Sequence, residues 1–437
     1  MGRIIEYATT IMLICALVGP VGIVISAIKY FLKRPEELSK KKKEKFVELY
    51  KDFLQNVNKY EEIAHEYYEK QEKILCNHLV YKPCWIHQKG EKLLKLNDVE
   101  IKCHEFLDKE KTLENIKAQF NKAIVPDNKQ DFEHNLRKLP LTREYKDQPT
   151  FAIKTFDLNE KECKATLDVY LCSFFDFLNT SIPFQYETVY EHKNKTHEEH
   201  SQKSIRKKYD ILDTTKRLST IGISVLTIFK NIKTRSATNE RSENVVETSD
   251  CRFLLHKRSA DVATSPNQIH VVPAGYYQPS KIQKVETQNE RNEMLKRKTD
   301  HLMLTVKREF IEEIFNVDEA ITYPNETVVN ELLKTYQIEN VFEEIYLLGC
   351  GFSPLAMNFE ILAVAVIDVN QMNMGKTEEE IHNKIKNNYE GMIELRPFKK
   401  ELLEHYIMNM PTTTAPLKFA FNIIINDFDN IRNQLKI

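Results

Sequence analysis

The feature that most constrains this chain is an uncharged segment near its start, the 21 residues from Ala8 to Ile28. At about 1.5 Å per residue, an α-helix of this length spans roughly 30 Å, which is the thickness of the hydrocarbon core of a bilayer. A cleaved signal peptide or a buried helix is the alternative, but a signal peptide has a more basic start and a shorter apolar run. The sequence therefore predicts a retained transmembrane anchor over residues 1–35, with its span at about residues 8–30.

Basic residues follow the span at Lys29, Lys33 and Arg34 and in the block 40–43. Such residues stay on the cytoplasmic side of a membrane. We therefore expect a single-pass protein whose C-terminal part is cytoplasmic and whose eight cysteines are reduced thiols. Several cysteines and histidines lie close together, but their spacing fits no common zinc site, so a structural metal and ordinary packing both stay open. They are Cys76, His78, Cys84, His87, Cys103 and His104.

Composition excludes some functions. The chain of 437 residues has a formal net charge of −1, so nothing global indicates a double-stranded nucleic acid as partner. It contains ten glycines and no phosphate-binding loop of the G-x-x-x-x-G-K type. The motif nearest to a dinucleotide fingerprint, 349–351, lacks the third glycine. Both of these nucleotide-binding folds are therefore unlikely for this chain, and its length predicts two or three folded units.

Residues 36–145 are predicted to form a helical linker or stalk. Apolar residues within 36–75 recur at alternating spacings of three and four, which is typical of a coiled-coil seam and equally of one amphipathic helix packed on its neighbours. These residues are Phe46, Tyr50, Phe53, Val57, Tyr60, Ala64 and Tyr67. A coiled coil directly after an anchor would make the protein a homo-oligomer. Residues 88–140 carry further helical periodicity.

The pattern changes near residue 146, and residues 146–437 are predicted to form one α/β domain. Runs rich in β-branched residues predict strands, at 150–154, 165–171, 220–229, 252–256, 269–272 and 361–369. Helices are expected at 173–178, 376–388, 397–408 and 416–428. The polar stretch 233–250 is expected to be a flexible excursion between strands. Strands alternating with helices in this way indicate a layered α/β fold.

The most informative stretch is the sequence REFIEEI at 308–314. On a helix, Glu309, Glu312 and Glu313 lie at i, i+3 and i+4, so their carboxylates share one stripe. Like charges on one stripe repel, and a hard divalent ion with oxygen ligands, Mg²⁺ or Mn²⁺, would relieve this repulsion. The alternative is a solvated acidic face, which is the more frequent explanation of such triplets in general. Arg308 can pair with Glu312 four residues later.

The order of a strand, then Pro273-Ala274-Gly275, then a helix with R-E-φ-x-E-E resembles the Nudix hydrolase superfamily. The resemblance extends over residues 220–370 and implies a Nudix-like α/β/α sandwich with an N-terminal extension. Three features depart from the family pattern. Phe315 replaces the glycine that ends the helix, although the next residue, Asn316, can adopt the left-handed conformation that glycine adopts there. Gly275 and Arg308 are 33 positions apart, roughly 19 more than in the pattern, and Asp300 stands where the family has its first Glu. These changes affect the expected fold and metal binding less than they affect the expectation that the site turns over a substrate.

The resemblance implies hydrolysis of a nucleoside diphosphate derivative. In that case Glu309, Glu312 and Glu313, with the backbone carbonyl of Ala274 or Gly275, would hold Mg²⁺. Asp300 and Arg308 would orient these ligands. Glu360, at the head of a later strand, is the candidate general base or further ligand, with an exposed strand-end acid as the alternative. Tyr276 and Tyr277 are candidates for stacking on a base, with simple packing as the alternative.

Two functions therefore compete. One is a membrane-tethered hydrolase of a nucleoside diphosphate derivative. The other, which we favour from the sequence, is a sensor whose Nudix-like domain binds a nucleotide and acts through its anchor. One span, a helical linker and a C-terminal Nudix domain resemble the membrane-anchored Nudix effectors of bacterial antiphage systems that signal with cyclic oligonucleotides (CBASS). That resemblance implies a cyclic-oligonucleotide ligand and a bacterial inner-membrane location. A scaffold with a degenerate Nudix fold is the third alternative.

Overall fold

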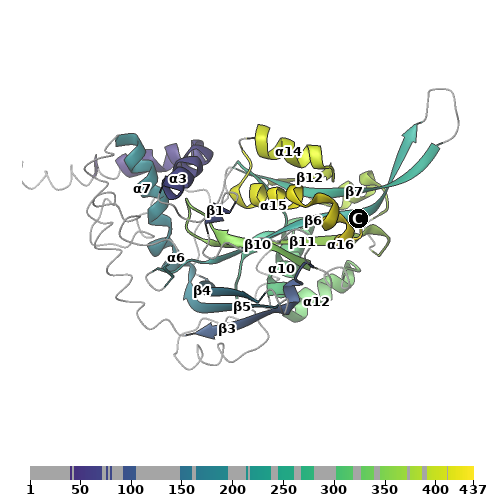
Figure 1. The fold of residues 1–437 in the computed structure, drawn as a ribbon, viewed down its shortest axis with the longest axis horizontal. Helices are drawn as coiled ribbons and strands as arrows, with labels where there is room; N and C mark the ends of the chain where they lie inside the picture. The colour runs from purple at the N-terminus through teal and green to yellow at the C-terminus, as the bar shows by residue number, and fades with distance from the viewer. Residues whose placement is uncertain are drawn as a thin grey trace, which may run out of the picture.

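A nine-stranded mixed sheet forms the centre of the protein (Figure 1). The computed structural model describes residues 40–41, 44–70, 75–76, 79–80, 92–104, 148–159, 164–194, 213–214, 217–237, 245–259, 267–279, 302–317, 326–338, 345–371, 375–385, 391–410 and 412–437. Seven strands of the sheet follow the order β1-β2-β10-β11-β6-β7-β12, while β8 pairs with β7 and β9 pairs with β6. The strands are β1 (Leu75–Cys76), β2 (Leu79–Val80), β6 (Ile221–Ala237), β7 (Val245–Arg258), β8 (Ile269–Val271), β9 (Ala274–Tyr276), β10 (Ile345–Phe352), β11 (Phe359–Asp368) and β12 (Gly391–Pro397).

Strands β8 and β9 lie where β6 and β7 separate. Toward the far end, β6 and β7 pair directly, starting at Ile228 and Phe253. At the near end, β9 pairs with residues 222–224 of β6, and β8 pairs with residues 255–257 of β7. The short segment β8–β9 therefore crosses from β7 to β6, and its backbone lies between these two strands. This crossing carries the Pro273-Ala274-Gly275 sequence.

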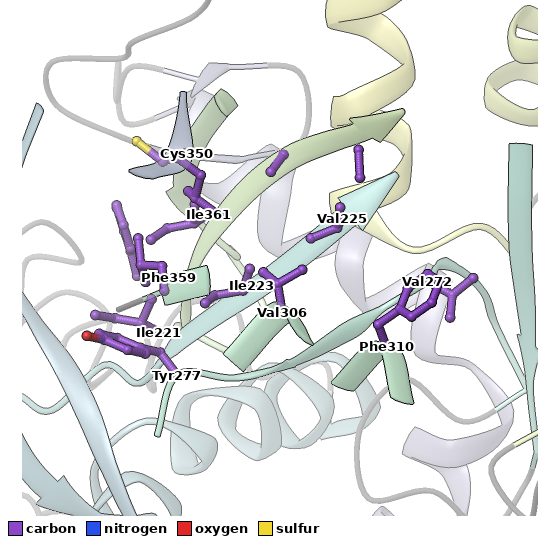
Figure 2. Packing of buried hydrophobic residues seen from close by; sticks show 14 of the residues in the cluster. Ile221, Ile223, Val225, Val272, Tyr277, Val306, Phe310, Cys350, Phe359 and Ile361 are labelled. Atoms are coloured by element: carbon purple, nitrogen blue, oxygen red, sulfur yellow. The ribbon is translucent and has the colours of Figure 1, made fainter. Parts of the chain in front are cut away.

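Helices cover both faces of the sheet. On β6, Ile223 and Val225 belong to the hydrophobic cluster that contains α10 (Leu302–Phe315), as Figure 2 shows with Val306 and Phe310. The alternate residues Leu226 and Ile228 pack with α15 on the other face, as expected from the two-residue period of a strand. The remaining helices are α6 (Phe174–Thr180), α7 (Ile182–Asn194), α12 (Glu326–Thr335), α13 (Glu378–Lys384), α14 (Lys400–Asn409), α15 (Ala415–Asn426), α16 (Phe428–Leu435) and the 3-10 turns η1 (Leu96–Asp98) and η5 (Val369–Gln371).

Helix α10 ends as the sequence predicts. Asn316 adopts the left-handed conformation with φ of 55°, which terminates an α-helix in place of glycine. Phe315, where the family pattern has glycine, stacks on Tyr336 with ring centroids 3.9 Å apart. The aromatic contact holds α10 against the turn that follows α12 and gives Phe315 a packing role.

A second, three-stranded sheet adjoins the large one. Its order is β3 (Val99–His104), β5 (Lys164–Ser173) and β4 (Pro149–Asn159). The backbone N–H of Ile153 donates to Ser219 O at 2.9 Å, and that of Phe151 donates to Tyr277 O at 3.0 Å. The N-terminal extension thus packs directly beside β6 and β9. His104, from the cysteine and histidine cluster, pairs with Asp168 at 3.0 Å.

The mixed α/β prediction is confirmed, with three corrections to its elements. Residues 92–104 contain no α-helix: the 3-10 turn η1 leads into β3, which finds its partner in β5, far along the chain. The expected excursion at 233–250 is largely a ribbon, since β6 runs to Ala237 and β7 begins at Val245 (Figure 1). The helix expected at 376–388 is limited to α13. The segment 8–30 lies outside the described residues, and no described helix is long and apolar enough to cross a bilayer.

Residues 44–55 and α3 (Val57–Lys70) form two consecutive helices that pack inside the protein. Their buried side chains belong to the same cluster as α10, which is the packing described by the amphipathic alternative. Phe46 and Phe53 contact Tyr186 of α7, at centroid distances of 5.6 and 5.8 Å. The boundary between a stalk and a domain at 145/146 stays a prediction.

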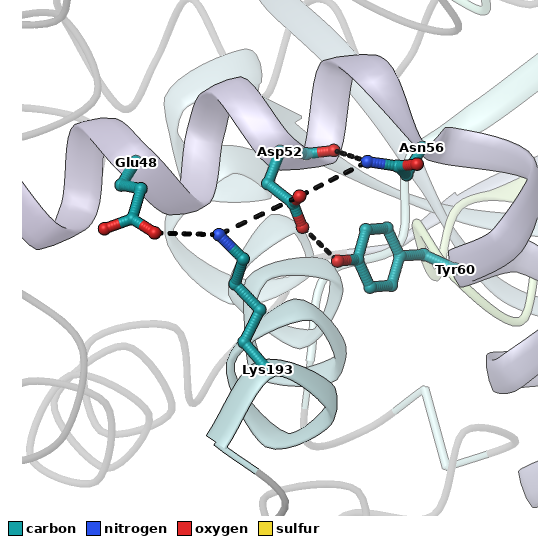
Figure 3. Close-up of polar contacts among 5 residues, drawn as sticks. All are labelled: Glu48, Asp52, Asn56, Tyr60 and Lys193. Atoms are coloured by element: carbon teal, nitrogen blue, oxygen red, sulfur yellow. Dashed lines mark hydrogen bonds and ion pairs between the residues drawn. The ribbon is translucent and has the colours of Figure 1, made fainter.

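Asp52 is the centre of the polar contacts at the break between these two helices (Figure 3). Its carboxylate accepts from Tyr60 Oη and Asn56 Nδ2, and lies 3.8 Å from Lys193 Nζ of α7. Lys193 also pairs with Glu48 at 3.0 Å, but the Glu48 side chain is 72% exposed. Because Tyr60 is buried, the Asp52 contact is the one whose loss leaves a desolvated hydroxyl.

We expect Asp52→Ala to lower the free energy of unfolding by about 1–3 kcal/mol, the cost of a buried donor that loses its acceptor. The matched variant Glu48→Ala removes an exposed partner of the same lysine and should cost at most about 0.5 kcal/mol. Urea unfolding of both variants measures the difference. Equal losses would show that Asp52 acts only as another surface charge.

Candidate functional site

Helix α10 carries the three predicted carboxylates in one stripe, at i, i+3 and i+4. Their side chains differ in exposure: 15% for Glu309, 13% for Glu312 and 4% for Glu313. Glu309 and Glu312 are therefore accessible to a small ion, while Glu313 points into the protein. The stripe lies beside the apolar residues of the helix, which pack in the core with residues of the sheet.

Glu309 lies directly on Gly275 of β9. A Cβ atom built on Gly275 would overlap the Glu309 carboxylate, at distances that no real side chain shows. A Cβ at position 275 would force the Glu309 side chain to move, so the missing side chain of glycine lets this carboxylate lie on the β9 backbone. This contact brings the two predicted halves of the site together, although they are 34 positions apart in the sequence.

Arg308 lies between two of the carboxylates. Its Nη2 is 2.6 Å from Glu309 Oε1, and its Nε is 3.5 Å from Glu312 Oε1. The Arg308 side chain is only 7% exposed, so its charge is compensated by these pairs. The guanidinium thereby fixes the orientation of Glu309 and Glu312, the role that the resemblance implies for it.

Glu313 is held by two strands. The backbone N–H of Ala274 donates to Glu313 Oε2 at 2.9 Å, and His256 Nδ1 of β7 lies 3.8 Å from Glu313 Oε1. The carboxylate thus spans the gap between β9 and β7. Sequence analysis did not single out His256. The available signal was a histidine two positions after Leu254, on the face of β7 that also carries Arg252 and Arg258.

The structure does not bring Glu360 to this stripe. Glu360 pairs in register with Gly222, and its two carboxylate oxygens lie 2.5 Å from the position of a Cβ on that glycine. Gly275 pairs with Ile223, the next residue of β6. Successive residues of a strand point to opposite faces, so Glu360 and Glu309 lie on opposite faces of the sheet. Glu360 is also buried, so it is not an exposed strand-end acid.

Burial raises the pKa of Glu360 to about 7, although hydrogen bonds from Ser224 and Asn358 and the charge of Arg258 act in the opposite direction. The unfolded chain ionises this group near its ordinary value of 4.5. Between these two pH values the unfolded state loses the proton first, so this group's contribution to stability is lost as the pH rises and stays lost above the folded pKa.

We expect Glu360→Gln to remove this part of the pH dependence. At pH 8 the variant should be more stable than the parent by roughly 1–3 kcal/mol, and at pH 4 the two should be similar. Unfolding by urea at both pH values tests this. If the free energies of unfolding of the two proteins changed with pH in the same way, the raised pKa of the buried Glu360 would be contradicted.

The two tyrosines after Gly275 differ. Tyr277 is fully buried and packs on Phe151, with centroids 4.6 Å apart, so it packs rather than stacks on a ligand. Tyr276 is half-buried and contacts Phe174 and Phe177 of α6. Asp300 lies outside the described residues, as do His78, Cys84 and His87 of the cysteine and histidine cluster.

The donor chemistry of the stripe fits a hard divalent cation, since carboxylate oxygens are the ligands that Mg²⁺ and Mn²⁺ prefer. The present arrangement provides a pair of accessible carboxylates. Within the described part of the chain, no group of three or more Cys, His, Asp or Glu side chains converges enough to hold a metal. Glu309 and Glu312 are thus the residues that fit a cation, with further ligands to come from elsewhere.

Comparisons with known proteins give matches among solved structures alone. No family model matches the sequence, and no curated protein matches it. Among solved structures, the chain is similar to a NUDIX hydrolase from Alicyclobacillus acidocaldarius, with 11% identity, 48% of this chain and 96% of that chain covered, and a TM-score of 0.26. This similarity is weak, so the chemistry of the site is argued from its side chains alone.

Proposed function

We propose that the protein binds and hydrolyses a nucleoside diphosphate derivative together with a divalent cation at the stripe of α10. The observation that carries this proposal is the placement of Glu309 on Gly275. It sets a pair of accessible carboxylates against the backbone of the β8–β9 crossing, which carries no side chain of its own at Gly275.

Each residue has a separate task in this proposal. Glu309 and Glu312 would hold the cation, since carboxylate oxygens and substrate phosphates are the ligands that Mg²⁺ prefers. Arg308 keeps the two carboxylates in place when the site is empty. Glu313 anchors β9 through the Ala274 amide. Bound Mg²⁺ supplies charge neutralisation and a water of lowered pKa.

A nucleotide sensor is the second candidate, and contacts of α3 favour it. Asn58 of α3 accepts a hydrogen bond from Gln268 just before β8, and Tyr68 Oη contacts Met357 Sδ at 3.5 Å just before β11. Helix α3 thus touches the residues that lead into β8 and those that lead into β11. A change at β8 or β9 would reach it directly. Membrane anchoring, the cytoplasmic orientation, homo-oligomerisation and an antiphage role remain proposals from the sequence alone.

Product analysis separates the two candidates. The full chain is incubated with Mg²⁺ and a panel of nucleoside diphosphate derivatives and cyclic oligonucleotides, and both binding and products are measured. Cleavage of a diphosphate bond supports the hydrolase. Binding of a cyclic oligonucleotide without cleavage supports the sensor, and neither result for any compound rejects nucleotide function at this site.

A further inference from the structure

His256 occupies an unusual position behind the carboxylate stripe. Its side chain is fully buried, and it reaches α10 from β7. Its ring nitrogen Nδ1 lies 3.8 Å from Glu313 Oε1, while the other oxygen of Glu313 accepts from Ala274 N–H. A single carboxylate thereby contacts two strands that do not pair with each other at this level.

The mechanical consequence follows from the topology. Strand β9 is only three residues long and is paired on one side with β6. On its other side, the Ala274 amide donates a hydrogen bond to Glu313 of α10. Glu313 therefore acts together with the β6 ladder in setting the position of the Ala274-Gly275 backbone, against which Glu309 packs. A residue that positions Glu313 therefore also acts on the Ala274-Gly275 backbone and on Glu309.

We propose that His256 is the positioning residue of this site: it fixes Glu313 and, through it, sets the Ala274-Gly275 backbone and the affinity for a divalent cation. The part that concerns the cation rests on the proposed function. The part that concerns the backbone does not. Partners behind the direct ligands typically change metal affinity by about 10- to 100-fold when they are replaced.

His270 offers a matched control. It lies opposite His256 in the register of β7 and β8 and is also buried. Its electrostatic neighbours are Arg258 and His256, and no contact with α10 is among its described interactions. Replacing either histidine removes a buried imidazole from the same strand pair, so both changes carry a similar cost for folding. Only one of them touches Glu313.

The test uses the full chain with His256→Leu, His256→Asn and His270→Leu, and two readouts. Calorimetric titration with Mn²⁺ should show a Kd raised about 10-fold or more in His256→Leu. The Kd should be largely recovered in His256→Asn, because asparagine keeps a donor near the place of Nδ1. In His270→Leu it should be unchanged within about twofold. Hydrogen exchange without metal should show faster exchange at the Ala274 amide in His256→Leu and not in His270→Leu.

Equal effects of His256→Leu and His270→Leu on Kd and exchange would overturn the proposal, as would unchanged values in His256→Leu. If the parent chain binds no Mn²⁺, the proposed function fails, and the positioning role of His256 is then decided by hydrogen exchange at the Ala274 amide alone. Faster exchange only in His256→Leu then supports the positioning role, and unchanged exchange rejects it.

Discussion

Glu309→Gln combined with Glu312→Gln should abolish cation-dependent turnover, and it should also lower the free energy of unfolding because it removes two carboxylate partners of the buried Arg308. Glutamine keeps the size of each side chain but removes the charge that holds a divalent ion. A metal contributes several kcal/mol of transition-state charge stabilisation, and this corresponds to about a 10³-fold loss of kcat. Steady-state release of product with Mg²⁺ measures the effect.

The control for this pair is Glu326→Gln with Glu331→Gln on α12. Both residues are exposed acids on the helix that packs beside α10, so this variant changes the net charge by the same amount without touching the stripe. It should retain parental turnover. Full activity in the Glu309 and Glu312 variant, or equal loss in the two variants, would reject the stripe as the catalytic site.

Gly275→Ala should have the second largest effect. Its Cβ would occupy the place of the Glu309 carboxylate, and because the added atom lies on a strand backbone, the carboxylate must move away. We expect cation affinity and turnover to fall by about 100-fold, with a loss of about 1–3 kcal/mol in stability from overpacking. Titration with Mn²⁺ and urea unfolding measure the two effects separately.

Gly349→Ala is the matched control for the overpacking itself. A Cβ at Gly349 would meet Ile423 and Phe419 at 3.1 and 3.2 Å, on the opposite face of the sheet from α10. It should lower stability without changing Mn²⁺ affinity. If both glycine variants lose affinity in proportion to their loss of stability, the contact between Gly275 and Glu309 has no specific role.

Much of this site was predictable from the sequence because its signals are local. The carboxylate stripe follows from helical spacing within 309–313, and the left-handed end of the helix follows from Asn316. The buried strands β6 and β11 are continuous runs of β-branched residues. Each of these features depends on residues that are near neighbours in the chain.

The remainder depends on pairings between distant segments. Strand β3 is paired with β5 across a long separation, and short-range periodicity gave a helix there instead. The face on which Glu360 lies depends on the register between β11 and β6, and a shift of one residue would reverse it. His256 became a site residue only through the contact between α10 and β7, which no spacing in the sequence indicates.

The most direct test of the central claim is calorimetric titration of the full chain with Mn²⁺, compared with the Glu309→Gln and Glu312→Gln double variant. The proposed site predicts saturable binding of one ion per chain in the parent, strengthened by a nucleoside diphosphate, and no binding at this stoichiometry in the variant. Identical isotherms for the two proteins, or no binding to the parent with nucleotide present, would contradict a divalent-cation site on α10.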